Sequence, residues 1–237
     1  MIKAVFFDVD DTLFAFTKCS SHAMRKVENY IEEQLGISPE ALREAIVKAQ
    51  ERIGGRIGFS HPSFHNRQIR FQNTLEILKK PVYPYANEMY KIYWEDVLKN
   101  ACAEPGIEKL LILLKKKNIY TGIGSDMTSY IQNKKVEKIG LAAYFDCFIT
   151  SEEVGQDKPG QKLFELCIEK AGVRPNECLF VGDNPQKDIS GAKKAGMYTA
   201  CYIRYSVPEQ REEMVCFDSY EKCICGEEIR IGDIRIV

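Results

Sequence analysis

The chain has 237 residues, of which 45% are hydrophobic and 28% are charged, so it is long enough to bury a sizeable core. Its 33 basic and 34 acidic residues give a formal net charge of -1, which excludes a general attraction to nucleic acid or to an anionic membrane. No stretch approaches the roughly eighteen uninterrupted apolar residues of a membrane span, and a strand pattern begins almost at the first residue, which leaves no room for a signal peptide. We therefore expect a cytoplasmic protein without nucleic-acid or membrane partners.

The first strand pattern is followed at once by acidic residues. Ala4 to Phe7 form an apolar run typical of a strand that is buried on both faces, and Asp8, Asp10 and Thr12 come directly after it. In open parallel sheets the ligand site lies beyond the carboxyl ends of the strands, so Asp8 and Asp10 are placed where chemistry is usually done. The competing interpretation is an acidic turn in which Thr12 is a local hydrogen-bonding residue or helix cap.

The next ninety residues have a helical pattern. Apolar spacing, proline and glycine predict four helices, over residues 21–35, 39–52, 60–80 and 86–101, with a glycine-rich loop at residues 54–58. Short connections between them favour a helical bundle inserted between the first strand and the rest of the chain.

From Glu104 onward, strand and helix patterns alternate. We predict strands at residues 119–124, 147–150, 178–182 and 199–203, and helices at residues 107–117, 126–139, 161–171 and 189–194. This alternation indicates right-handed crossovers, and therefore an α/β fold with a doubly wound, mostly parallel, Rossmann-like sheet. Residues 228–237 alternate about a Gly-Asp turn and predict a small hairpin of no assigned function.

Two polar residues near the ends of these strands fit a phosphate site. Ser125 follows Gly122-Ile-Gly124 and precedes the helix expected from Asp126, so its hydroxyl and the helix N-terminus predict an anion pocket, although a plain N-cap has the same arrangement. Lys158 lies in the loop after residues 147–150. A lysine there is usually a solvated charge, but at this edge of the sheet it would neutralise both a phosphoryl group and a nucleophile.

Two further acids follow the strand at residues 178–182. Asp183 leaves this strand and Asp188 lies near the next helix start, and two carboxylates brought together there would repel unless a cation binds. Hard oxygen ligands, with no convergent histidine or cysteine, favour Mg²⁺ over zinc.

The nine cysteines are scattered through apolar runs, at positions 19, 102, 147, 167, 178, 201, 216, 223 and 225. An odd, dispersed set is typical of small buried hydrophobic residues in a reducing compartment. Only Cys223 and Cys225 are close in sequence. With no second pair of cysteines or histidines nearby, they make an incomplete zinc site.

Together these motifs resemble the haloacid dehalogenase-like (HAD) hydrolase superfamily in order and spacing. The matching residues are Asp8-x-Asp10-x-Thr12, then Ser125, then Lys158, then Gly182-Asp183 followed by Asp188. The resemblance covers nearly the whole chain, and its helical insertion is similar to the C1 cap of subfamily I. It implies a core of residues 1–14 and 104–237 and a helical cap of residues 15–103.

The resemblance also implies roles for these residues. Asp8 would be the nucleophile, and Asp10 the general acid and base, with its carbonyl on the metal. Ser125, Asp126 and Lys158 would bind phosphate, and Asp183 would complete the Mg²⁺ site with Asp8 and Asp10. Thr12 would brace the first loop, and Asp188 would act through water or through Lys158.

The same resemblance separates reaction classes. Dehalogenases of the family lack an acid two positions beyond the nucleophile, whereas this chain has Asp10, which favours hydrolysis of a phosphate monoester. A phosphonatase would need a cap lysine suited to Schiff-base chemistry, and the lysines here are typical of solvated charges. A sugar-phosphate mutase of the same fold and a non-catalytic HAD-like binding module remain alternatives.

The cap is expected to set substrate choice. Arg56, His61, His65 and Arg67 surround a glycine loop and would face an anionic or hydroxylated leaving group, as in a sugar phosphate or nucleotide. The competing interpretation is a solvated helix face. We expect a small phosphate ester as the partner and a monomer or homodimer as the assembly.

Overall fold

The chain forms two compact units. The computed structural model describes residues 1–209, 212, 214–226 and 228–236. The core unit consists of residues 1–15 and 102–237, and the helical unit of residues 16–101. Each unit is described by itself below.

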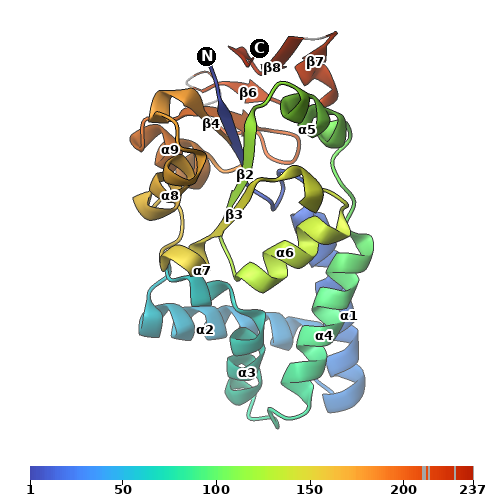
Figure 1. The fold of residues 1–237 in the computed structure, drawn as a ribbon. Coiled ribbons are helices and arrows are strands. Elements are labelled where there is room, and N and C mark those ends of the chain that lie inside the picture. Colours follow the sequence, from blue (N-terminus) through green and yellow to red (C-terminus); the bar gives the residue numbers. More distant parts are fainter. Residues whose placement is uncertain (210–211, 213, 227, 237) are drawn as a thin grey trace. The chain divides into compact units, whose positions relative to one another are not determined.

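A six-stranded parallel sheet organises the core unit, with the strand order β3-β2-β1-β4-β5-β6 (Figure 1). Its strands are β1 (Ala4–Phe7), β2 (Tyr120–Ser125), β3 (Cys147–Thr150), β4 (Cys178–Gly182), β5 (Tyr198–Tyr202) and β6 (Cys216–Phe217). Every pairing within this sheet is parallel, and the chain crosses from β3 to β4 over the central strand β1. The predicted doubly wound α/β fold is therefore confirmed, and the short edge strand β6 is an addition to it.

Helices cover both faces of this sheet. They are α5 (Ile107–Lys116), α6 (Ser129–Lys138), α7 (Ser151–Val154), α8 (Gln161–Ala171) and α9 (Ser190–Lys194). Figure 1 shows α8 and α9 on one side of the sheet and α5 and α6 on the other, as right-handed crossovers in opposite directions require. Successive side chains of β1 serve opposite faces: Phe6 belongs to the cluster around Phe164 and Phe180, whereas Phe7 contacts Phe145 and Tyr220.

The register of the sheet brings three strand ends together. Phe7, the last residue of β1, pairs with Ile123 of β2 and with Val181 of β4. The three strands therefore end at the same edge of the sheet, with β2 continuing to Ser125 and β4 to Gly182. This edge carries most of the polar residues that the sequence indicates for chemistry.

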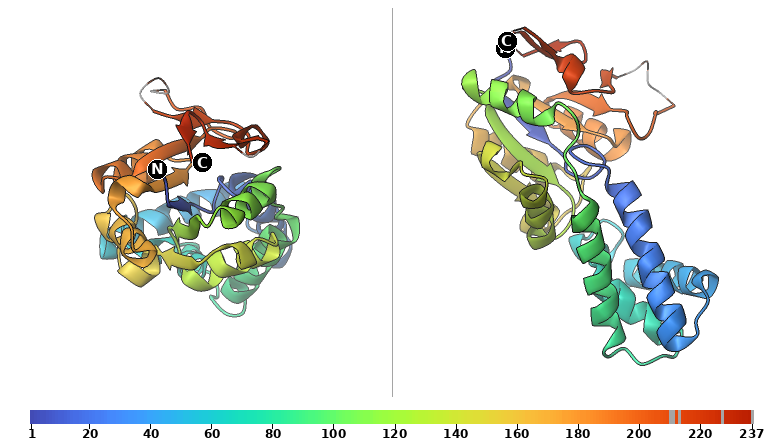
Figure 2. Two further views of the ribbon diagram at one scale, coloured as in Figure 1. Left: turned by 45° about the horizontal axis from the view of Figure 1, so that its top comes forward. Right: turned by 90° about the vertical axis from the view of Figure 1, so that its right-hand side faces the viewer.

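The helical unit contains α1 (Phe16–Leu35), α2 (Pro39–Ile57), α3 (Arg67–Ile77) and α4 (Tyr85–Asn100), with a 3₁₀ turn η1 (Pro62–His65) before α3 (Figure 2). Helix α1 packs against α4, and α2 packs against α3. Ser38 caps α2 by accepting a hydrogen bond from the Ala41 amide, and Pro39 takes the first helical position.

Three predicted helix boundaries in this unit were wrong. Helix α1 begins at Phe16 rather than Ser21, and α2 continues through the glycines that were predicted to form a loop. Gly54 lies within α2, and its missing side chain leaves room for a ring: a Cβ there would lie 2.3 Å from Cε1 of Phe59. The single helix predicted over residues 60–80 is split, since the Asn66 carboxamide oxygen accepts the Gln68 and Ile69 amides and starts α3.

Residues after β6 form a small second sheet. Strands β7 (Ile224–Cys225), β8 (Glu228–Ile231) and β9 (Ile234–Arg235) pair antiparallel, which confirms the predicted hairpin. Val237, the last residue of that prediction, lies outside the described residues.

The structure shows the state of the cysteines and the character of the helices. All nine cysteines are free, and five of them are buried. Among the described residues, neither Cys223 nor Cys225 joins a group of three potential metal ligands. Within the same part of the chain, no helix combines the length and apolar character needed to cross a membrane.

Candidate active site

Asp8 stands directly beyond the central strand. Its backbone amide still donates to the Val181 carbonyl at 2.8 Å, so the residue is fixed by β4, and it is only 7% exposed. The chain then turns sharply, with Asp11 at a φ of 54° and the Leu13 amide bonded to the Val9 carbonyl at 2.9 Å. The carboxylate of Asp8 is therefore held at the edge where the three strands end.

Lys158 binds two carboxylates at once. Its Nζ lies 2.7 Å from Oδ1 of Asp8 and 2.6 Å from Oδ1 of Asp188, and it also donates to the Gly124 carbonyl at 3.2 Å. Burial alone would lower the pKa of this lysine, but Asp188 and Asp8 outweigh that effect and hold its pKa well above the ordinary value. Lys158 is thus a fixed positive charge between the two acids.

Asp183 and Asp188 complete an acidic group with Asp8. One carboxylate oxygen from each of these three residues lies within 4.8 Å of the other two. Burial, followed by the charges of Asp8 and Asp188, raises the pKa of Asp183 to about 8. Burial also raises the pKa of Asp188, to about 6, against the opposing effect of Lys158. Three crowded oxygen donors with one lysine among them fit a hard divalent cation.

Gly182 makes room for this group. A Cβ on Gly182 would lie 2.4 Å from Oδ2 of Asp188, which also accepts the Asn184 amide at 3.0 Å. The glycine is therefore required for Asp188 to reach Lys158.

Ser125 is the last residue of β2, and its surroundings differ from the prediction. Helix α6 begins at Ser129 rather than at Asp126, so Ser125 is not at the helix N-terminus. Met127, at a φ of 105°, turns the chain between them. The Gln132 amide nitrogen donates to Oγ of Ser125 at 2.7 Å and to the Asp126 carbonyl at 2.9 Å. A side chain of α6, rather than the helix start, fixes the hydroxyl.

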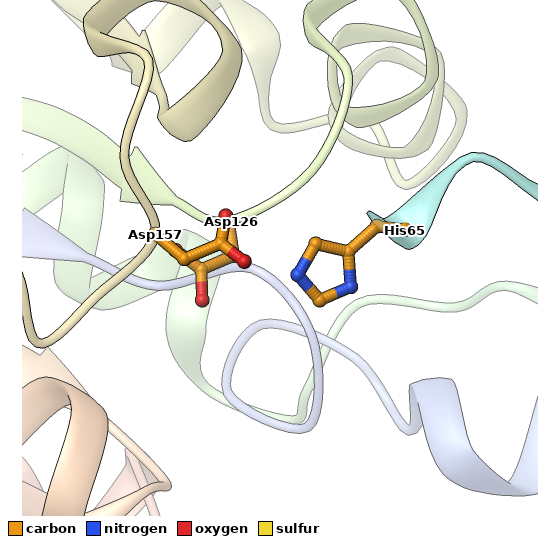
Figure 3. Close-up of side chains that lie close together, drawn as sticks. All are labelled: His65, Asp126 and Asp157. Atoms are coloured by element: carbon orange, nitrogen blue, oxygen red, sulfur yellow. The ribbon is translucent and has the colours of Figure 1, made fainter. Parts of the chain in front are cut away.

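Asp126 joins two loops of the core unit. Its Oδ1 accepts the Lys158 backbone amide at 2.8 Å, and its Oδ2 accepts Nζ of Lys187 at 2.8 Å. The buried Asp157 lies beside it, with carboxylate oxygens of the two residues within 4.8 Å (Figure 3). His65, also drawn in Figure 3, belongs to the helical unit. The Asp126 carboxylate therefore acts as an acceptor that ties these loops together, rather than as a group that would bind phosphate.

Lys135 is a site residue that the sequence interpretation missed. It is fully buried, and its Nζ lies 2.7 and 2.8 Å from the two carboxylate oxygens of Asp10. Burial raises the pKa of Asp10, although Lys135 opposes this effect. The available signal was helical spacing, since Lys135 lies four residues from both Ile131 and Ile139 and so shares their buried face.

Thr12 is expected to brace the first loop, and the hydrogen bond that it offers there comes from its backbone rather than from its side chain. Its Oγ1 is buried and has no hydrogen-bond partner among the described residues. Instead its carbonyl accepts the Tyr220 hydroxyl at 3.1 Å, so a residue far along the chain supports the loop.

The four predicted specificity residues have local contacts within the helical unit. The His61 ring accepts the Ser63 amide at 3.1 Å, and Arg56 reaches the Asn73 side chain at 3.5 Å. The Arg67 guanidinium lies 5.3 Å from the centre of the Tyr93 ring, and the His65 ring packs edge-on against Phe64.

The core unit is a Rossmann-like sheet, and aspartates gather around the buried Lys158 at its carboxyl edge. A helical insertion follows the first strand. These features define a HAD-type hydrolase. Residues 2–196 match the family model described as haloacid dehalogenase-like hydrolase, and the chain belongs to that family. The predicted hydrolase class is therefore confirmed.

Curated relatives of similar length are phosphatases. The chain is 31% identical over 224 residues to a glyceraldehyde 3-phosphate phosphatase of Methanothermobacter thermautotrophicus, which covers 91% of each chain. It is 29% identical over 204 residues to a ribulose-1,5-bisphosphate 5-phosphatase of Halopiger xanaduensis, which covers 85% of each. Among solved structures, a HAD phosphatase from Thermococcus onnurineus superposes with a TM-score of 0.67 at 27% identity, over 88% of this chain and 90% of that one.

Proposed function

We propose that this hydrolase cleaves small phosphate monoesters through an aspartyl-phosphate intermediate on Asp8. The observation that carries this proposal is the carboxylate of Asp10. It lies two residues beyond Asp8 in the sequence and is held by the buried Lys135. Family dehalogenases lack this acid, whereas transfer of a phosphoryl group from an alkoxide needs one to protonate the leaving oxygen. The phosphatase names of the two curated relatives support the same reaction.

In the first step, a carboxylate oxygen of Asp8 attacks phosphorus in line with the ester bond. The new Asp8–phosphorus bond forms as the bond to the ester oxygen breaks, and Asp10 gives that oxygen a proton. Lys158 keeps the negative nucleophile and the negative phosphoryl group from repelling each other, because it is already paired with Asp8. The Ser125 hydroxyl, positioned by Gln132, binds a phosphoryl oxygen.

In the second step, water hydrolyses the intermediate. The ionised Asp10 accepts a proton from the water, whose oxygen attacks phosphorus and releases Asp8 and inorganic phosphate. Asp10 thereby regains the proton that it gave in the first step, and the cycle closes without another reactant.

Mg²⁺ would be held by Asp8, Asp183 and the backbone carbonyl of Asp10. Bound there, it would supply positive charge that stabilises the phosphoryl oxygens in the transition state. The oxygen donors and the crowding of the acidic group fit this ion.

Sugar phosphates are the first substrates to test, because the names of both relatives specify one. Activity would be measured as inorganic phosphate released from sugar phosphates, nucleoside monophosphates and para-nitrophenyl phosphate, with Mg²⁺ or with EDTA. We expect turnover that requires Mg²⁺ and that falls by at least about 10³-fold in Asp8→Asn, since the nucleophile is lost.

Four results would count against the proposal. Equal activity in EDTA would show that the reaction does not need Mg²⁺. An active Asp8→Asn variant would show that Asp8 is not the nucleophile. Conversion of a sugar phosphate to an isomer without phosphate release would favour the mutase. Folded protein that turns over no panel member would favour the non-catalytic module.

A further inference from the structure

The helical unit contains a pocket of its own. It lies between α1, α2 and α3 and has a volume of about 500 Å³, which is in the range of small-molecule sites. Its apolar wall includes Met24, Ile46 and Phe71, and its polar wall includes Ser20 and Ser21.

The pocket carries an excess of positive charge. Four arginines and a single acidic residue, Glu28, are among the described residues that line it. Arg43 already neutralises that acid, since its Nε and Nη2 donate to the two Glu28 oxygens at 2.7 and 2.8 Å. Arg25, Arg67 and Arg70 therefore have no acidic counterpart among the described residues of the lining.

Arg70 is the most informative of these residues. It is only 7% exposed, and its Nε has no hydrogen-bond partner among the described residues. Its Nη2 donates to the Phe64 carbonyl at 3.0 Å, and the guanidinium lies 5.7 Å from the centre of the Phe64 ring. Burial, followed by the charge of Arg67, lowers the pKa of Arg70 to about 9.

Such an arrangement is costly in the absence of an anion. A buried guanidinium with an unpaired donor pays a desolvation penalty, and a second guanidinium nearby adds repulsion. The planar fork of arginine matches the oxygens of a carboxylate or a phosphate, which would relieve both effects.

We propose that this pocket binds a small organic anion, with a carboxylate or phosphate group held by Arg70 and Arg67 and a short apolar or hydroxylated body against Met24 and Phe71. All of the described residues that line this pocket belong to the helical unit.

The single tryptophan of the chain offers a selective probe. Trp94 belongs to α4 of the helical unit, is 4% exposed, and packs 4.9 Å from Tyr93, the ring that Arg67 covers. Its fluorescence therefore reports on the packing around α4 in the helical unit.

The test is a fluorescence titration of the full-length protein in EDTA, at constant ionic strength. The probes are inorganic phosphate, glycerol 2-phosphate, acetate and 3-hydroxybutyrate, with chloride as the reference ion. We expect a saturable change for at least one probe, with binding at least about tenfold weaker in Arg70→Met, because a charged hydrogen bond is lost. Comparing the phosphate with the carboxylate probes shows which head group the pocket prefers.

Matched variants make the result decisive. Arg52→Met removes an exposed arginine of α2 outside the pocket lining and should bind within about twofold of the wild type. Arg67→Gln, at a partly exposed position, repeats the test if Arg70→Met does not fold, and it should also weaken binding. A response no greater than that to chloride, or equal weakening by Arg52→Met, would overturn the proposal.

Discussion

The ammonium group of Lys135 contacts both carboxylate oxygens of Asp10, at 2.7 and 2.8 Å. The lysine is fully buried on α6, whereas the aspartate side chain is 25% exposed. A buried charge of this kind fixes the direction of its partner, because leaving it would strand an unpaired ammonium in the protein interior. Asp10 is thereby held in one orientation beyond β1.

Replacing this lysine should impair proton transfer. We expect Lys135→Met to lower kcat/KM for an alkyl phosphate by about 10²-fold or more, within the range that general acid catalysis contributes. The loss should be smaller for para-nitrophenyl phosphate, whose leaving group needs little protonation. Lys134→Met, which removes the exposed neighbour paired with Glu137, is the control and should behave as the wild type. Equal losses for the two substrates would show that Lys135 supports folding rather than Asp10.

Removing Lys158 should destabilise the core unit in a pH-dependent manner. Lys158→Met leaves Asp8 and Asp188 buried without their shared cation, and should cost about 3–5 kcal/mol of unfolding free energy at pH 8. The cost should shrink at pH 5, because Asp188, with a pKa near 6 that rises further without the lysine, then takes up a proton. Urea denaturation at both pH values measures this. Lys187→Met, at a partly exposed ion pair with Asp126, should cost at most about 1 kcal/mol.

Metal binding should depend on the protonation of Asp183. The pKa of Asp183, about 8, lies above the ordinary value of 3.8. The metal-free folded state therefore prefers protonated Asp183. Its free energy of unfolding falls as the pH rises toward 8 and this proton is lost. Mg²⁺ needs the ionised form, and its apparent affinity should fall by about tenfold for each pH unit below 8. Thermal unfolding with Mg²⁺ or EDTA should therefore show a larger metal-induced rise in Tm at pH 8 than at pH 6. Asp183→Asn should weaken the pH dependence of the metal-free stability and that of the Mg²⁺-induced rise in Tm. A variant with the wild-type response would exclude this residue as a ligand.

The glycine before Asp183 should tolerate no side chain. Gly182→Ala places a methyl group 2.4 Å from the Asp188 carboxylate, so we expect a tenfold or greater loss of kcat and a destabilisation of about 1–3 kcal/mol. Gly55→Ala is the matched change, since a Cβ there meets no atom within 4 Å and α2 gains a better helix former, by about 1 kcal/mol. Activity and urea midpoints of the two variants can be compared directly, and similar behaviour would refute the steric argument.

The parts of the fold that were predictable are those in which local pattern and tertiary position agree. Asp8, Ser125 and Asp183 lie at or directly after the ends of apolar strands, and parallel pairing brings such ends together. Gly54 shows the opposite case. A glycine pair indicates a loop by propensity, but Gly54 lies inside α2 with the Phe59 ring beside it.

The residues that escaped prediction act over long distances in the sequence. Lys135 pairs with a residue 125 positions away, and Tyr220 with one 208 positions away. A lysine on a helix and a tyrosine near the end of a chain are ordinary surface residues by composition. Helical spacing could have indicated that Lys135 is buried, but only the folded structure shows that Lys135 and Tyr220 both contact the loop after β1.

The match to the family model ends at residue 196, before β5 and before Tyr220. A recombinant chain shortened to that boundary would keep Asp8, Lys158 and Asp188, yet β4 would lose its neighbour β5 and become an open edge of the sheet. An unpaired apolar strand of this kind recruits other chains, so the shortened protein would be prone to aggregation. A shortened chain that keeps β4 covered therefore extends at least through β5, and one that keeps the hydrogen bond from Tyr220 to the Thr12 carbonyl extends to Tyr220, well beyond the last residue that carries chemistry.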